Sequence, residues 1–189
     1  MKTEKKTQLF KEQYEKLAGQ VYVTQTPSGV VKAMQEILAQ SKARKGVTTP
    51  EFVNLPLQPQ KLLTPQNFPR VPFEICDELS PPGINAADVG VSAVSFGIAF
   101  TGTVVEVTAN DSARLVSSLP RVHVALLPGT EIVPSLEEAA PRLRRIYAEH
   151  PGSCQITFIS GPSRTADIEM RLFLGVHGPQ ASYVIVCDF

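Results

Sequence analysis

The sequence predicts a single α/β domain built around a mostly parallel sheet, and three observations support this. A chain of 189 residues with 43% hydrophobic content can bury one core. Short apolar runs rich in β-branched residues, with little polar alternation, are typical of strands covered on both faces. Helical patterns lie among these runs, which favours a layered α/β architecture. The runs are residues 104–107, 122–127, 156–159 and 183–186.

The N-terminal part predicts two helices around a short strand. Residues 4–18 form a polar helix with one narrow apolar face, which alone would be marginal and therefore packs on the domain or on a partner. Residues 21–23 read as a strand. The second helix begins with Thr26 as N-cap and Pro27 in its first turn. Gly46, after a basic stretch, is a typical C-terminal signal.

Three regions can be distinguished within this one structural domain. Residues 1–45 form a helical part, residues 46–82 a proline-rich connecting segment, and residues 83–189 the main core. The prolines exclude long helices from the connecting segment, where we expect loops and short extended pieces such as residues 71–76.

A further helix is expected after residue 135. Ser135 and Glu138 have the spacing of a capping box, and an apolar stripe follows. Pro141 removes one backbone hydrogen bond, so we expect this helix to be kinked or to begin later than the cap suggests.

Composition narrows the possible partners and cofactors. Eighteen basic and eighteen acidic residues balance, so nothing favours nucleic acid or an anionic membrane as partner, and a homo-oligomer is compatible with the low charge. Cys76, Cys154 and Cys187 are far apart, so we expect small buried side chains and no iron–sulfur or four-cysteine zinc site on this chain. With no apolar leader and no apolar run of about 20 residues, we expect a cytoplasmic protein.

The strongest candidate for a binding site is the segment 160–169. Here a predicted strand runs into a Gly-Pro turn and a hydroxyl-rich stretch that opens a predicted helix. Arg164 and the free N–H groups of a helix start would attract an anion at the carboxyl end of a strand. The alternative is a structural cap, with Thr165 as N-cap and Asp167 in the first turn.

Two other segments carry candidate residues. Thr101, Gly102 and Thr103 could present hydroxyls and a close backbone approach to a ligand, or simply form a tight turn before a strand. His177, in a glycine-rich turn, is a candidate general base or an exposed loop residue without a role. His123 lies within an apolar strand and is interpreted as structural.

Several well-known motifs are absent from the sequence. It contains no phosphate-binding GxxxxGK[ST] loop, no GxGxxG fingerprint, no HExxH helix and no GxSxG elbow, and its histidines lack metal-ligand spacing. The candidate chemistry therefore depends on the three segments above.

Taken in order, these segments resemble the lactate-utilisation (LUD) domain family. The resemblance is carried by residues 101–103, 119–126, 157–169 and 175–179, and is most specific in the run Gly-Pro-Ser-Arg-Thr-Ala-Asp. It implies a fold similar to the sugar-isomerase and coenzyme A transferase superfamily. It also implies a role in oxidising L-lactate to pyruvate together with two iron–sulfur partner proteins, which would carry the clusters.

Substrate roles can be assigned on this basis. Arg164 would pair with the carboxylate of lactate, Ser163 and Thr165 would orient it, and His177 would accept the hydroxyl proton. Asp167 and residues 101–103 complete the expected substrate site.

One departure from the family pattern and two alternatives stay open. The family usually has an acidic residue where this chain has Phe100, and Glu106 is a candidate replacement. One alternative is a stand-alone enzyme or sensor that binds a phosphorylated metabolite or nucleotide. The other is a structural subunit whose N-terminal helix and proline-rich segment form the partner interface.

Overall fold

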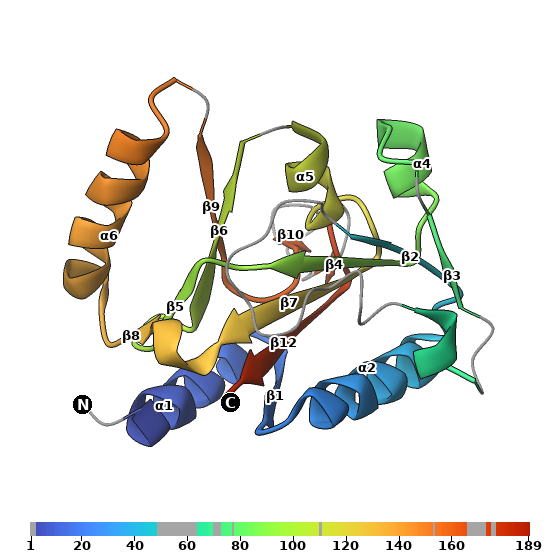
Figure 1. Cartoon of the computed structure of the whole chain (residues 1–189), viewed down its shortest axis with the longest axis horizontal. Coiled ribbons are helices and arrows are strands. Elements are labelled where there is room, and N and C mark those ends of the chain that lie inside the picture. Colours follow the sequence, from blue (N-terminus) through green and yellow to red (C-terminus); the bar gives the residue numbers. More distant parts are fainter. Residues whose placement is uncertain are drawn as a thin grey trace.

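A parallel sheet forms the centre of the protein (Figure 1). The computed structural model describes residues 3–48, 64–69, 73–76, 78–109, 111–152, 154–165, 173–174 and 177–189. Within these residues the main sheet has six strands, and every pair of neighbours runs parallel, which confirms the predicted α/β class. In spatial order the strands are β1 (Gln20–Thr24), β12 (Ala181–Cys187), β7 (Val122–Pro128), β4 (Val89–Ala93), β2 (Lys45–Thr48) and β3 (Glu74–Ile75).

Helix α2 (Pro27–Ser41) covers one face of this sheet with an apolar stripe. As predicted, it begins after Thr26, whose side chain accepts a hydrogen bond from the Gly29 N–H at 3.1 Å. The predicted C-terminal signal is wrong. Lys42 adopts the left-handed conformation at the helix end, whereas Gly46 lies inside β2 against the ring of Phe73.

Helix α1 (Thr3–Lys16) packs against the opposite face. Although its sequence is mostly polar, α1 carries two fully buried aromatic side chains, Phe10 and Tyr14. Their rings are stacked, with 5.6 Å between the ring centroids. They contact apolar residues of β7 and β12, so the apolar face of α1 is occupied by this domain's own core.

A second, mixed sheet lies beside α1. Among the described residues its strand order is β8 (Ile132–Val133), β5 (Phe96–Ile98), β6 (Thr103–Thr108) and β9 (Gln155–Ile159). Strand β6 runs antiparallel to both of its neighbours. The run 156–159 is therefore a strand, as predicted, but not a doubly covered one: β9 lies at the edge of the small sheet and is partly exposed throughout.

Helix α6 (Leu136–Glu149) covers the outer face of the small sheet, preceded by the short 3-10 helix η2 (Gly129–Glu131). It begins directly after Ser135 and continues through Pro141, so the expected late start is wrong. The Ser135 side chain caps no backbone N–H, so the predicted capping box does not form.

The remaining elements are short. The connecting segment contributes η1 (Pro65–Asn67), β3 and the start of α4 (Pro81–Asn85), while its residues 49–63 and 70–72 lie outside the described part. Helix α5 (Asp111–Val116) packs beside α4 and against strands β2 and β4 of the main sheet. Strands β10 (Arg164–Thr165) and β11 (Phe173–Leu174) form a separate antiparallel pair.

Candidate functional site

Two of the predicted segments meet through a chain of hydroxyl groups. Thr101 Oγ1 and Thr103 Oγ1 share a hydrogen bond of 2.7 Å, and Thr103 Oγ1 shares another of 2.8 Å with Ser160 Oγ. Thr103 opens β6 and Ser160 follows the neighbouring strand β9, so antiparallel pairing places them side by side. The contact thus joins residues that are 57 positions apart in the chain.

Two glycines let these turns press against α1. Gly102 has a φ of 58°, and a Cβ there would lie 2.4 Å from the backbone nitrogen of Tyr14. Gly161 has a φ of 87°, and a Cβ there would lie 2.5 Å from the carbonyl oxygen of Leu17. Only glycine tolerates both the conformation and the close approach. The C-terminal half of α1 therefore positions the hydroxyl chain.

Tyr14 also ties this region to the main sheet. Its phenol oxygen lies 2.5 Å from Ser182 Oγ near the start of β12. Burial raises the pKa of Tyr14 to about 12, against the opposing effect of hydrogen bonds from Ser182 and the Gly161 backbone, so the phenol stays protonated at neutral pH.

The predicted segment 175–179 joins segment 160–169 through the backbone. The Ser163 N–H donates to the carbonyl oxygen of Pro179 at 2.9 Å, and the Gly178 backbone packs against the Ser163 side chain. His177, the candidate base, is adjacent to this contact and exposed. The hydroxyl chain, Ser163 and His177 thus belong to one continuous set of loops.

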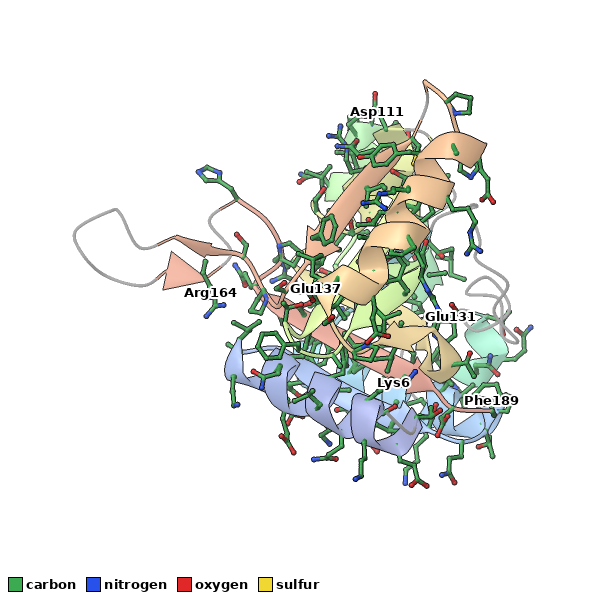
Figure 2. The ribbon with its side chains drawn as sticks, turned by 90° about the vertical axis from the view of Figure 1, so that its left-hand side faces the viewer. Lys6, Asp111, Glu131, Glu137, Arg164 and Phe189 are labelled. Carbon is green, nitrogen blue, oxygen red and sulfur yellow. The ribbon has the colours of Figure 1, made fainter. Side chains whose placement is uncertain are left out.

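Arg164 lies in β10 and is exposed. Figure 2 shows it at one side of the molecule, well away from Glu131. Thr165 is the second residue of β10, and the helix expected after it lies outside the described residues, so an anion held by a helix N-terminus stays a prediction here. Asp167 lies outside the described residues.

The loops lie at the amino edge of the main sheet rather than at its carboxyl edge. Tyr14 contacts Ser182 at the start of β12, and the Gln180 N–H donates to the Arg121 carbonyl just before β7 begins. Segment 160–169 does follow the carboxyl end of a strand, as expected, but that strand, β9, belongs to the mixed sheet and not to the parallel one.

Phe100 and Glu106 have different environments. Phe100 is 70% exposed beside the hydroxyl chain. Glu106 is buried on β6 and accepts a hydrogen bond from Ser117 Oγ at 2.7 Å. It lies three strand positions from Thr103, which corresponds to about 10 Å and to the opposite face of the sheet. Glu106 therefore does not place a carboxylate where the family has its acidic residue.

Sequence reasoning missed a concave region at the carboxyl edge of the main sheet. A cleft of about 520 Å³ opens where β4 ends and η2 follows β7, beneath α6. The scattered residues that line it include Phe96, Glu131, Arg142, Arg145 and Cys154. Cys154 is half-buried, unlike Cys76 and Cys187, which are buried as predicted.

Comparison with known proteins identifies the family. The LUD domain model matches residues 7–187, nearly the whole chain. The chain belongs to the LUD domain family. This agrees with the resemblance carried by its Thr-Gly-Thr and Gly-Pro-Ser-Arg-Thr-Ala-Asp segments.

Curated relatives of this LUD domain are lactate utilization protein C of several bacteria. The protein of Shouchella clausii is 43% identical over 103 residues, covering 54% of this chain and 45% of the relative. The Bacillus subtilis protein is 42% identical over 105 residues, covering 54% of this chain and 43% of the relative. These matches thus span less than half of each relative's length.

A solved structure resembles the LUD domain in fold. A DUF162 family protein from Deinococcus radiodurans superposes with a TM-score of 0.68 at 16% identity, covering 99% of both chains.

Among the described residues, no helix has the length and apolar character needed to span a bilayer. The same residues contain no cluster of three or more His, Cys, Asp or Glu side chains suited to a metal ion.

Proposed function

We propose that this LUD domain is a subunit of a system that oxidises L-lactate to pyruvate and acts with iron–sulfur partner proteins. The observation that carries the proposal is the identity of about 40% to lactate utilization protein C, in a chain that belongs to the same family. The meeting of the three candidate loops at one edge supports it, because a small substrate needs several polar groups within reach of each other.

The reaction requires an anchor for the carboxylate and an acceptor for a proton. Oxidation removes the hydroxyl proton, the hydrogen on the neighbouring carbon and two electrons in all. In the proposal Arg164 holds the carboxylate and His177 takes the hydroxyl proton, both being exposed at the amino edge. Ser163, Thr165 and Asp167 orient the substrate. The hydrogen on the carbon leaves as a second proton to water, and the two electrons pass one at a time to iron–sulfur clusters on the partner proteins.

The hydroxyl chain has a supporting role in this scheme. The two hydrogen bonds among Thr101, Thr103 and Ser160 use two of their three hydroxyl protons, and their oxygens retain acceptor capacity. Because Gly102 holds the turn tightly against α1, these hydroxyls are positioned before a substrate arrives, which lowers the entropic cost of binding.

The anchor is tested by measuring L-lactate binding to the purified protein by NMR titration. Arg164→Gln is expected to weaken binding roughly tenfold or more, since a charge-assisted hydrogen bond is lost. Arg144→Gln, on the exposed surface of α6, serves as the matched control and should leave the affinity unchanged. Equal affinities for all three proteins would remove Arg164 from the substrate site.

The proton acceptor is tested in the system reconstituted with its iron–sulfur partners. His177→Gln should leave lactate affinity close to that of the wild type and lower turnover by about 10²-fold or more. A variant that keeps full turnover would show that His177 is not the base.

A further inference from the structure

The cleft at the carboxyl edge is separate from the loops of the proposed lactate site. Ala93, the last residue of β4, and Glu131 of η2 line one side of it, and the second half of α6 lines the other. Ligands of open α/β sheets commonly bind outside the carboxyl ends of parallel strands. The position of the cleft, and not any motif, therefore makes it a candidate binding site.

The size of the cleft sets the size of its ligand. A volume of about 520 Å³ is in the range of pockets that hold cofactor- or drug-sized molecules. A molecule as small as lactate would leave most of this space empty. The inference below is thus independent of the lactate proposal.

The walls of the cleft combine apolar surface with guanidinium groups. Val107 and Ile146 supply the accessible apolar part, and Phe96 lies buried behind them. Arg142 lies 5.8 Å from the Phe96 ring centroid and pairs with Glu131, so its position is fixed and its charge is balanced.

Arg145 is the second arginine of the cleft wall. It stands three residues after Arg142, on the same side of α6, and also lines the cleft. Its ion pair with Glu149 is 3.9 Å long and more than half of each side chain is exposed, so this pair is weak. An incoming anion can therefore displace Glu149 at little cost.

One hydroxyl beside the cleft has unused hydrogen-bonding capacity. Thr108, at the end of β6, lines the cleft, and its Oγ1 has no hydrogen-bond partner among the described residues. Buried polar atoms are normally paired, and an unpaired one is common where a ligand or water completes the site.

We propose that this cleft binds an organic phosphate of nucleotide size, with the phosphate on Arg145 and a flat ring system against the partly exposed side chains of Val107 and Ile146. Arginine matches a phosphate with two parallel hydrogen bonds, which favours a phosphate over a neutral ligand. The aliphatic wall favours a ligand with an apolar ring system over a sugar phosphate alone.

The experiment uses AMP and flavin mononucleotide, two phosphomonoesters with flat rings of different size, and measures affinity by calorimetry. At least one should bind, while adenosine, riboflavin and inorganic phosphate alone should each bind at least about tenfold more weakly. Absence of binding by both phosphomonoesters at millimolar concentration would overturn the proposal.

Variants on α6 locate the phosphate. Arg145→Gln should weaken binding about tenfold, while Arg144→Gln, which changes a neighbouring arginine outside the cleft, should have no effect. Glu149→Gln removes the competing carboxylate and should leave affinity equal or higher. If Arg145→Gln and Arg144→Gln behave alike, the phosphate does not lie on Arg145 and the proposal is wrong.

Cys154 reports whether the ligand occupies the cleft itself. It is half-buried in the cleft wall, whereas Cys76 and Cys187 are buried. A thiol reagent should therefore react first at Cys154, and a bound phosphomonoester should slow that reaction several-fold. Cys154→Ser identifies the signal by abolishing it. Binding that leaves the Cys154 rate unchanged would place the ligand elsewhere and overturn the assignment.

Discussion

Helices α1 and α6 have the same length of 14 residues but differ in how they are packed. Helix α1 lies against the main sheet and buries Phe10 and Tyr14 completely. Helix α6 lies on the outer face of the small sheet, and of the residues described along it Ala139 alone is buried. Leu136 and Tyr147 of its apolar stripe are largely exposed.

The sequence patterns of the two helices suggest the opposite, that α6 is the more deeply buried. Helix α6 has the longer apolar stripe and α1 the more polar composition. Burial depends on the position of each helix in the fold: α1 packs against the main sheet with strands of the small sheet close by, whereas α6 has protein on one side only. Two large aromatic side chains on a narrow stripe thus contribute more buried apolar surface than a broad stripe at the periphery of the fold. Because α6 buries few of its side chains against the small sheet, space for the cleft remains between them.

Two tyrosines test this comparison with the largest expected effect. Tyr14→Ala should lower the free energy of unfolding by about 3–5 kcal/mol, because it removes a fully buried ring and its hydrogen bond to Ser182. Tyr147→Ala, the same change on α6 at a residue 58% exposed, should cost less than about 1 kcal/mol. Urea denaturation followed by circular dichroism measures both.

The intermediate variant Tyr14→Phe separates the ring from the hydroxyl. It keeps the packing and should cost about 1–2 kcal/mol for the lost bond and the unpaired Ser182 oxygen. Similar losses for Tyr14→Ala and Tyr147→Ala would contradict the difference in packing between the two helices.

A second pair of residues compares the centre of the main sheet with the end of α6. His123 is fully buried on β7, and its Nε2 lies 2.9 Å from Ser92 Oγ on β4. Burial lowers its pKa from 6.5 to about 4, so it is neutral in the folded protein. The unfolded chain binds a proton below about pH 6.5 and the folded one does not. The free energy of unfolding should therefore fall by about 3 kcal/mol between pH 6.5 and pH 4 through this residue.

The contribution of His123 is measured by denaturation at several pH values. His123→Gln, which cannot take up a proton, should flatten the acid limb of the stability curve even if it lowers stability at pH 7. His150→Gln, at the exposed C-terminal end of α6, is the control and should leave the slope unchanged. Equal slopes for wild type and His123→Gln would rule out a neutral buried imidazole.

Sequence reasoning succeeded where local pattern decides the outcome. The β-branched runs became strands because such residues pack well in a covered sheet, and Thr26-Pro27 started α2 because capping is a local interaction. It failed for β9, because an apolar run does not encode which strand it pairs with. For Thr165 the outcome is open: it pairs with Phe173 of β11, and the residues that would form a helix after it lie outside the described part.

The candidate site divides in the same way. Thr101, Thr103 and Ser163 can be selected as candidates because glycine-flanked hydroxyls are a recognisable local pattern. Their convergence was not predictable, since the Thr103–Ser160 contact depends on the register of two distant segments. The cleft was missed because its residues come from several separate elements and none is unusual by itself.

Two glycines provide the test with the smallest expected effect. Gly102 and Gly152 both have positive φ, at 58° and 87°, so alanine is conformationally strained at either position. At Gly102 the new methyl group would also lie 2.4 Å from the Tyr14 backbone nitrogen on α1, which cannot move away easily. A Cβ at Gly152, after α6, would have no described atom within 4 Å apart from those of the adjoining residues.

Gly152→Ala should therefore cost about 1 kcal/mol for backbone strain alone, and Gly102→Ala about 1–2 kcal/mol more for the clash with α1. Thermal and urea denaturation measure the difference, in which the shared strain cancels. If the two variants are equally destabilised, the turn at Gly102 is free to move away from α1. The helix would then not hold the hydroxyl chain in place, and the pre-positioning assigned to Thr101, Thr103 and Ser160 would lose its basis.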